Sequence, residues 1–364
     1  MKIEVSWVKD IKPAIKIFLN KMSNNDYSYF KYSYSGDLFD ISERWGLGNI
    51  VFATKILFIT GLLDELESVY VNNLYKGIIK FSDFNGYIHD PKVTYLPLKD
   101  KIYNYIQRTD MNNNKDIENT MRAETRQSFV ALSLLNKRPQ KAFRFIPYSE
   151  NGIEDYLSSF NWQFPWHAGS HFSHLLFFLN MNSKLFHYKQ EEYKTLIAFS
   201  CNWISKLQSK DNGCWYSGDN TSLSEKINGA LKVLTGLHAA DIYDFPYPEK
   251  LIDTALAGIN DSEACSNFNI SYVLYSANKI CPKYRKTEIE DFLLNRVNIY
   301  KDFYFPEYGG FSFHIGKAND VYYGRKITKG KPEPDIHGTA MFVLGLAIIN
   351  SVINLGLEWK VPLN

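Results

Sequence analysis

The sequence lacks long hydrophobic runs. No continuous apolar stretch reaches the length of about 18 residues that a membrane-spanning helix needs. The N-terminal segment MKIEVSWVKDIKPAIKIFLNKM contains an early acid and a proline and has no continuous apolar core, so it does not resemble a signal peptide. We therefore expect a protein without a membrane span that is located in the cytoplasm.

The sequence also lacks charge blocks and cysteine motifs. Its 41 Lys and Arg and 39 Asp and Glu residues are mixed along the chain and give a net charge of +2, so we do not expect nucleic acid as a partner. The four cysteines, Cys201, Cys214, Cys265 and Cys281, have no CxxC spacing. This spacing argues against a zinc ribbon or a disulfide framework and favours free thiols in a reducing compartment.

Linkers and low-complexity tracts are absent as well. Because no Pro/Ser-rich segment divides the 364 residues, we predict one domain over residues 1–364. Strand signals are short and lie in glycine-rich loops, and the polar region 83–123 is expected to be the least regular part. Aromatic residues, in contrast, make up 16% of the chain. They suit a cavity with aromatic walls, although a coding bias towards Phe and Tyr explains them equally well.

The strongest signal is a repeated pattern in which polar residues lead into an apolar helix. The six segments are RWGLGNIVFATKILFITGL, RAETRQSFVALSLL, WHAGSHFSHLLFFLN, SEKINGALKVLTGL, EACSNFNISYVLYSAN and DIHGTAMFVLGLAII. Amphipathic stretches such as QEEYKTLIAFSCNWISKLQ and KTEIEDFLLNRVNIYKDF lie between them. Alternating apolar and amphipathic helices predict an all-α (α/α)6 toroid with an inner and an outer layer. The polar helix starts then converge on a central cavity, where free N–H groups favour polar or anionic ligands.

The segment WISKLQSKDNGCW resembles the QW motif of the terpenoid cyclase and protein prenyltransferase superfamily. Its matching residues are Trp203, Ile204, Gln208, Gly213 and Trp215. The resemblance implies a toroid in which the Gln side chain caps a helix end near the Trp. Two further segments, YGGFSF and DIHGTA, are similar to the Gly-Gly-Phe loops of that superfamily and to the Asp-x-Asp-Asp-Thr-Ala turn of class II terpene cyclases. The central Asp of that turn is the proton donor in those cyclases, and His337 stands in its place here.

Two helix starts carry our candidates for acid/base chemistry. In DIHGTA, Asp335 orients the imidazole of His337 so that it acts as a base, and Asp335 also suits a helix cap. In RAETRQ, Arg126 is expected to clamp a phosphate or carboxylate, with Glu124 as its orienter or as a general acid/base. Arg122 is expected to contact the substrate as well. The alternative for RAETRQ is a structural ion-pair network of Arg122, Glu124 and Arg126.

The segment HAGSHFSH places three histidines on one helix face. His167 and His171 are expected to be cavity-lining contacts, and His171 is also a candidate acid/base. A zinc site at His167, His171 and His174 is a weaker alternative, because the Glu of an HExxH motif is missing. Trp166 offers a stacking surface or a core contact.

Further substrate contacts are predicted at Lys226 and Asn228 in SEKING, at Asn267 in ACSNFN, and at Arg325. Arg325 belongs to the basic loop 314–331, which is either a lid over an anionic ligand or a solvated loop. The sequence requires no cofactor and leaves zinc and magnesium open, and it does not indicate the oligomeric state.

The leading functional prediction is an enzyme of the terpenoid cyclase and prenyltransferase type. It would bind an isoprenoid-like or anionic-headed substrate in a central cavity with aromatic walls, such as Phe129, Phe172, Tyr272 and Phe342. The first alternative is a lyase, hydrolase or epimerase for an acidic glycan. In that enzyme His337 or His171 is the base, a Tyr is the acid, and Arg126 with Lys226 neutralises a uronate. The second alternative is a non-catalytic binding module, which fully paired polar helix starts would favour.

Overall fold

The structure, a computed structural model, describes residues 5–95, 113–187 and 189–362. These residues are mostly helical, which confirms the all-α prediction. The described strands form two small antiparallel hairpins, one of β1 (Tyr304–Phe305) with β2 (Gly310–Phe311) and one of β3 (Val321–Tyr322) with β4 (Arg325–Lys326). As predicted, these strands lie in glycine-containing loops.

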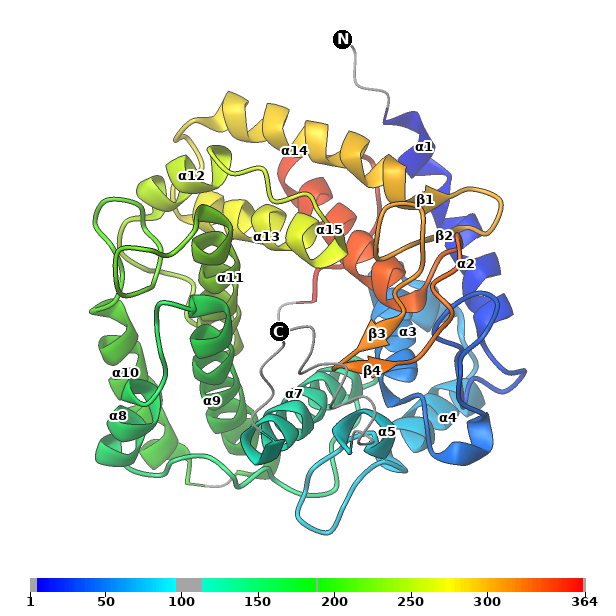
Figure 1. Cartoon of the computed structure of the whole chain (residues 1–364), viewed down its shortest axis with the longest axis horizontal. Coiled ribbons are helices and arrows are strands. Elements are labelled where there is room, and N and C mark those ends of the chain that lie inside the picture. The colour runs from blue at the N-terminus through cyan, green and yellow to red at the C-terminus, as the bar shows by residue number, and fades with distance from the viewer. Residues whose placement is uncertain (1–4, 96–112, 188, 363–364) are drawn as a thin grey trace.

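Six long helices, here called the inner helices, lie around the middle of the view in Figure 1. In chain order they are α3 (Leu47–Ile59), α7 (Asn113–Leu134), α9 (Pro165–Phe186), α11 (Leu223–Ala239), α13 (Ala264–Ile280) and α15 (Ile336–Ile353). Each inner helix packs against the next one in the chain, and α15 also packs against α3. The contacts between the inner helices therefore form a closed series that begins and ends at α3.

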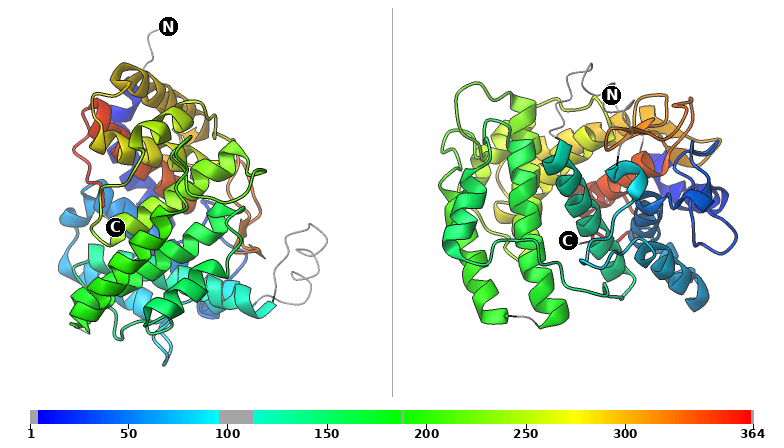
Figure 2. Two further views of the ribbon diagram at one scale, coloured as in Figure 1. Left: turned by 90° about the vertical axis from the view of Figure 1, so that its left-hand side faces the viewer. Right: turned by 60° about the horizontal axis from the view of Figure 1, so that its bottom comes forward.

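A second set of helices, here called the outer helices, lies outside the inner helices in Figure 1. They are α2 (Ile11–Met22), α4 (Ser68–Ile79), α8 (Glu150–Ser158), α10 (Gln190–Ser205), α12 (Pro248–Leu256) and α14 (Lys286–Tyr300). Outer and inner helices alternate along the chain, and neighbours such as α9 and α10 run side by side (Figure 2). Short helical segments complete the fold: α1 (Ser6–Lys9), α5 (Pro91–Thr94), η1 (Ile41–Glu43), η2 (Leu62–Glu65) and η3 (Lys301–Phe303).

The two sets differ in burial as their sequences predict. Along α3 almost every side chain is buried and α15 buries most of its residues, whereas α2 and α12 bury one face only. Helices such as α3 and α15 are covered by neighbouring inner helices and by outer helices, which suits their nearly all-apolar sequences. Removal of this apolar surface from water stabilises the fold.

Among the described helices, α15 alone is long and apolar enough to cross a membrane by length and composition. However, 61% of it is buried inside the protein, as in a core helix. The description of α15 as a core helix agrees with its contacts to α3, α13 and α14. The structure thus gives no clear membrane span in its described part.

The QW-like segment fixes the loop after α10. Gln208 Nε2 donates to the carbonyl oxygen of Gly213 at 2.9 Å, and Gln208 pairs with Trp215, which is buried. Gly213 has a φ of +71°, and a Cβ there would lie 2.5 Å from the backbone nitrogen of Leu251. The Gln side chain therefore holds a loop carbonyl, whereas the resemblance implied that it caps a helix end.

Candidate functional site

Side chains from all six inner helices interact with one another. Arg126 on α7 influences Lys55 on α3, Lys232 on α11 and Tyr272 on α13, although α7 contacts neither α11 nor α13 in the series described above. Interactions across non-adjacent helices require side chains that face a shared interior. We call this set the central cluster: Lys55, Arg122, Glu124, Arg126, His171, His174, Lys232, Cys265, Tyr272 and His337, with Tyr32, Asn319, Tyr322 and Tyr323 from the loops beside them.

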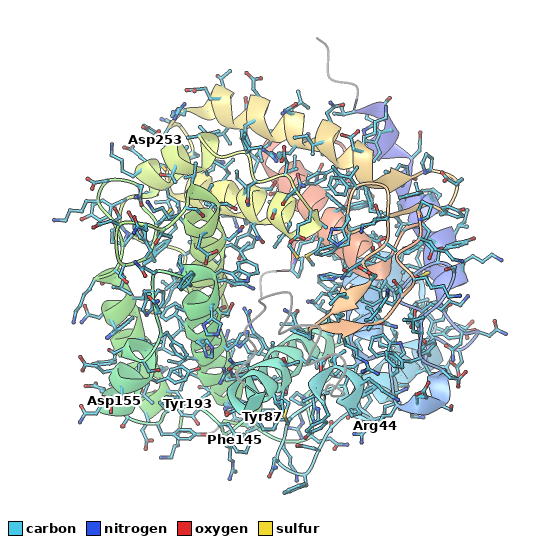
Figure 3. All side chains as sticks on the ribbon, viewed as in Figure 1. Arg44, Tyr87, Phe145, Asp155, Tyr193 and Asp253 are labelled. Carbon is cyan, nitrogen blue, oxygen red and sulfur yellow. The ribbon has the colours of Figure 1, made fainter. Side chains whose placement is uncertain are left out.

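Four cations dominate the central cluster: Lys55, Arg122, Arg126 and Lys232. Within the described part of the chain, none of them has a carboxylate oxygen within 4 Å. The ion pairs that are described lie elsewhere. One of them joins Asp253 on α12 to Arg285 at 2.8 Å, at the periphery of the molecule (Figure 3). The interior therefore carries positive charge that the described residues do not neutralise.

Our sequence analysis did not identify Lys55 and Lys232, two cations of the central cluster with lowered pKa values. Burial, with the nearby Arg126 as second cause, lowers the pKa of Lys55 to about 7 and that of Lys232 to about 8. Both lysines stand in the middle of otherwise apolar runs, VFATKILFI and GALKVLTGL. A single charge inside an apolar inner helix is the sequence signal that would have found them.

His337 lies at the first turn of α15 in an aromatic setting. Its ring stacks on Phe52 with a centroid separation of 4.3 Å and an interplanar angle of 12°. The rings of Phe313 and Tyr322 lie beside it at 4.7 and 6.0 Å. Burial, with Lys55 as second cause, lowers the pKa of His337 to about 3, so the imidazole is neutral at pH 7.

The hydrogen bonds around His337 determine which nitrogen carries its proton. Asn319 Oδ1 accepts from the backbone N–H of Val321 at 3.3 Å, so its Nδ2 is the atom that donates to the Tyr32 hydroxyl at 2.9 Å. The Tyr32 O–H then donates to His337 Nδ1 at 3.0 Å. This assignment places the proton of His337 on Nε2, so Nε2 is a possible donor to a ligand and cannot act as a base.

Asp335 has one of the two roles that we expected for it. Its carboxylate accepts from the backbone N–H groups of Gly338 at 2.7 Å, Phe313 at 2.8 Å and Asn319 at 3.0 Å. The cap on α15 that we predicted is thus present, and the carboxylate also fixes the preceding loop. Tyr32, and not Asp335, orients the His337 imidazole, because the carboxylate oxygens already bind backbone donors.

The rest of the DIHGTA turn is also structural. A Cβ at Gly338 would lie 2.4 Å from the backbone nitrogen of Phe313, so the close approach of the loop requires glycine. The hydroxyl of Thr339 accepts from the Phe311 N–H at 3.0 Å. Burial raises the pKa of Asp335 to about 6, although the hydrogen bonds that its carboxylate accepts from backbone N–H groups lower this pKa. Asp335, Gly338 and Thr339 of this turn therefore hold backbone contacts, whereas the His337 side chain faces the central cluster.

His171 on α9 has the same tautomer as His337. Arg122, which always donates, approaches His171 Nδ1 at 2.8 Å, and the Tyr156 hydroxyl lies 2.8 Å from the same atom. The proton of His171 is therefore on Nε2. Burial and then Arg122 lower the pKa of His171 to about 2. Neither predicted histidine base can accept a proton at Nε2 in this arrangement.

Glu124 is nearly completely buried and forms no ion pair with Arg122 or Arg126 in the described residues, so the predicted ion-pair network is absent there. Its Oε2 accepts from the backbone N–H of Asp90 at 2.7 Å, whereas its Oε1 has no described partner. Burial and the nearby Asp90 raise the pKa of Glu124 well above its usual value. The Glu124 carboxyl group therefore holds its proton to a higher pH than an exposed glutamate does.

The predicted contacts on α11 and α13 do not join the central cluster. The Lys226 ammonium lies 4.4 Å from the ring centroid of Tyr216, and Asn228 Oδ1 accepts from Asn260 and Asn269. Asn267 is fully buried and contacts Arg296 on the outer helix α14. A polar residue at a helix start can therefore also serve a contact with the outer layer.

Trp166, His167 and Arg325 lie at the edge of the central cluster. Trp166 receives the Lys232 ammonium 3.9 Å from its ring centroid, and the exposed His167 lies 4.8 Å from the His171 ring. The Arg325 guanidinium lies 4.9 Å from the ring of Phe39. In the loop 314–331 the lysines are exposed, whereas Tyr322 packs on Gly48 at the start of α3. The loop therefore turns aromatic and not basic groups inward.

The expected aromatic wall is only partly present. Phe342 packs outward against Tyr300 of α14 at 4.7 Å, and Phe129 packs against Phe178 at 5.6 Å. These rings, like the fully buried Phe172, belong to the core between helices. Tyr272 interacts with Arg126 and belongs to the central cluster.

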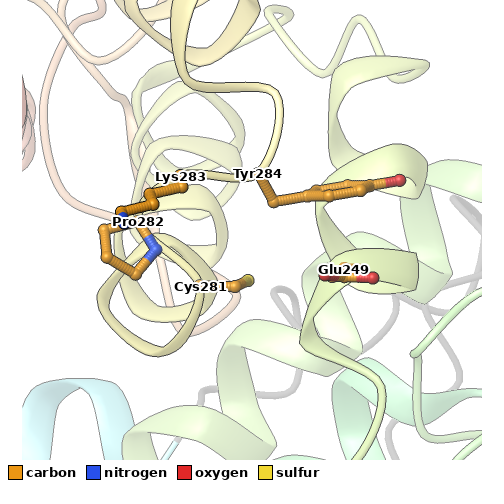
Figure 4. Close-up of a pocket in the computed structure, with 5 residues that line it drawn as sticks. All are labelled: Glu249, Cys281, Pro282, Lys283 and Tyr284. Atoms are coloured by element: carbon orange, nitrogen blue, oxygen red, sulfur yellow. The ribbon is translucent and has the colours of Figure 1, made fainter.

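No group of three or more His, Cys, Asp or Glu side chains in the described residues is arranged to hold a metal ion. A pocket of about 510 Å³ lies on the outside, at the turn between α13 and α14 (Figure 4), and is lined by Glu249, Cys281, Pro282, Lys283 and Tyr284. The Cys281 thiol there donates to the carbonyl of Ala277, and the pocket shares no residue with the central cluster.

Comparison of the chain with family models, curated proteins and solved structures gives no match in any of the three.

Proposed function

We propose that the protein is an enzyme with the (α/α)6 toroid architecture whose central cluster binds an acidic glycan. The observation that carries the proposal is the set of four central cations without a carboxylate partner in the described residues. A buried cation is costly unless it is paired, so an interior with several unpaired cations indicates an anionic ligand. The closed series of inner-helix contacts supports the architecture.

The central cluster contains the groups that elimination from a uronate needs. Cations beside the carboxylate stabilise the charge that develops when the neighbouring C–H proton is removed. Lys55 is the proposed base, because its amine is partly deprotonated at neutral pH. Glu124, a neutral acid, is the proposed proton donor to the leaving oxygen. A C–H and a C–O bond break, a C=C bond forms, and the Nε2–H groups of His337 and His171 hold substrate oxygens.

Two further observations bear on the alternatives. If the protein is instead of the terpenoid cyclase and prenyltransferase type, the central anion would be an isoprenoid diphosphate; the contact of Gln208 with a loop carbonyl differs from the helix cap which that resemblance implied. The unpaired atoms Arg122 Nε, Glu124 Oε1, Arg126 Nε and His174 Nδ1 speak against a module with fully paired helix starts. Four free cysteines suit the reducing cytoplasm that we propose as the location.

The test is incubation of the purified protein with two panels, uronate-containing or sulfated glycans and isoprenoid diphosphates, with mass spectrometry of the products. We expect an unsaturated glycan product, and we expect Arg126→Met to abolish it while Arg138→Met, at an exposed position, does not. Conversion of an isoprenoid diphosphate would support the second candidate. Turnover of a glycan that survives Arg126→Met would refute the proposed site.

A further inference from the structure

Two loops outside the central cluster expose aromatic side chains. Residues 80–90 follow α4, and residues 135–149 follow α7. In the first loop Phe84 is 81% exposed, and in the second loop Phe145 is 45% and Tyr148 is 41% exposed. A ring in water does not contribute the stability that its burial would give, so several exposed rings in neighbouring loops indicate a binding surface.

The two loops are in direct contact. The Lys141 ammonium donates to the Phe84 carbonyl at 2.7 Å, and a Cβ at Gly86 would lie 3.5 Å from the Cβ of Lys141. The rings of Tyr87 and Phe145 stack with a centroid separation of 4.8 Å, and Figure 3 shows both side chains near the edge of the molecule. The exposed rings of the two loops therefore belong to one surface.

Both loops are anchored to inner helices. The backbone N–H of Ile88 donates to the Thr125 hydroxyl on α7 at 3.0 Å. In the second loop, the Phe143 carbonyl accepts from Asn182 Nδ2 on α9 at 2.6 Å, and the Phe143 N–H donates to Asn182 Oδ1 at 3.1 Å. Because these contacts hold the loops in place, little further ordering of their backbone is needed when a ligand binds.

The second loop also carries a high density of positive charge. The segment NKRPQKAFRFIPY, residues 136–148, contains no acid and four cations: Lys137, Arg138, Lys141 and Arg144. The contacts described for the two lysines are neutral, since the Lys137 ammonium lies 5.9 Å from the ring centroid of Tyr75 and the Lys141 ammonium binds a carbonyl. This surface therefore combines exposed rings with several cations.

Few acids lie near this surface to balance its charge. Glu118 on α7 and Asp83 lie close to Tyr87, because after burial they raise its pKa. The Asp83 carboxylate also accepts from the backbone N–H groups of Asn85 at 2.8 Å and of Tyr87 at 3.0 Å. The four cations of the second loop outnumber these two acids, so the surface is complementary to a negatively charged partner.

We propose that these two loops dock the protein on an anionic lipid surface. The rings of Phe84, Phe145 and Tyr148 would lie at the level of the lipid headgroups, where aromatic side chains are favoured, and the four cations beside the anionic headgroups. Exposed rings that alternate with cations along one segment suit a fluid surface, which needs no complementary shape. The inference goes beyond the proposed function and does not depend on it.

The test is co-sedimentation of the full chain with two kinds of vesicle, one of phosphatidylcholine and one of equimolar phosphatidylcholine and phosphatidylserine. We expect binding to the anionic vesicles to be at least about tenfold tighter than to the neutral vesicles, and to weaken as salt is added. No binding to the anionic vesicles, or equal binding to both kinds, would overturn the proposal.

Variants connect the binding to these residues. Phe84→Ser should weaken binding to the anionic vesicles about tenfold, whereas Phe84→Trp should preserve it, because either ring can enter the interface. Arg138→Gln should weaken binding about fivefold. The controls are Ile259→Ser, at an apolar position that is 72% exposed, and Lys301→Gln, at an exposed cation, and neither should change binding. Unchanged binding by Phe84→Ser would overturn the proposal.

The alternative occupant is a second copy of the chain. Sedimentation velocity without vesicles measures this association for the wild type and for Phe84→Ser. Self-association that Phe84→Ser abolishes, combined with no vesicle binding, would assign the surface to a dimer contact and overturn the proposal. Vesicle binding is measured without a glycan, so failure of the proposed function and failure of this inference are distinguishable.

Discussion

Replacement of Lys55 by methionine should make the protein more stable. Lys55 is largely buried beside Arg126, and its pKa is lowered from 10.5 to about 7. This change corresponds to about 5 kcal/mol of destabilisation in the folded state when the amine is protonated. Methionine has a similar length and no charge, so the variant should regain part of this amount, about 2 to 4 kcal/mol at pH 7, after loss of the hydrogen bond to Gln127.

The pH dependence of this difference gives a sharper test. Below pH 7 the ammonium is charged in the folded and in the unfolded protein, and the full cost of burial applies. As the pH rises from 7 towards 10.5, the folded protein loses the proton first, so the cost declines. The stability advantage of Lys55→Met should therefore be largest at pH 6 and less than half as large at pH 9.

Urea unfolding of both proteins at these two pH values measures this difference. Lys194→Met, at an exposed position, is the control and should change the free energy of unfolding by less than about 0.5 kcal/mol at either pH. A destabilised Lys55→Met variant, or an advantage that grows with pH, would show that Lys55 is not an uncompensated buried cation.

Three further outcomes follow from the contacts. Asp335→Asn should lower the free energy of unfolding by about 2 to 4 kcal/mol at pH 7 in urea titrations, because an amide cannot accept from all three backbone donors; an unchanged midpoint would contradict the assigned role. Gly213→Ala should cost at least about 2 kcal/mol more than Gly316→Ala, since both glycines have φ near +70° but a Cβ at Gly316 meets nothing within 4 Å; equal melting temperatures would refute this. Nitrogen-15 NMR should show one Nε2–H tautomer for His337 in the wild type and a mixture after Tyr32→Phe; a proton on Nδ1 in the wild type would refute the hydrogen-bond assignment.

The sequence predicted the helices well because each inner helix carries a local signal. A nearly all-apolar run longer than ten residues, such as that of α3 or α15, is buried almost regardless of which elements surround it. The two outer helices α8 and α12, of nine residues each, were not singled out, because about two turns give little periodicity.

The site was harder to predict because its decisive contacts are distant in sequence. Asp335 before an apolar run is recognisable as a cap, but its contacts to Phe313 and Asn319 depend on how the loop folds back. Nothing near His337 in the sequence indicates that Tyr32 positions its proton. Lys55 and Lys232 were visible as isolated charges in apolar helices, and the pattern search passed over them because it looked at helix starts.

The contact between the segment around Tyr32, which precedes α3, and the start of α15 also determines when the site can exist. The backbone N–H of Ile336 donates to the Tyr32 carbonyl at 2.9 Å, and Ser35 donates to the Glu333 carboxylate through its N–H and its hydroxyl. Tyr32 reaches His337 only through this junction, which joins segments about three hundred residues apart. During synthesis, α3 leaves the ribosome long before α15, the second inner helix that it contacts, has been made. Until α15 has been made, one apolar flank of α3 lacks its packing partner. A chain that has not completed this last step lacks the Tyr32 partner of His337, so the junction delays any activity of His337 until folding is complete.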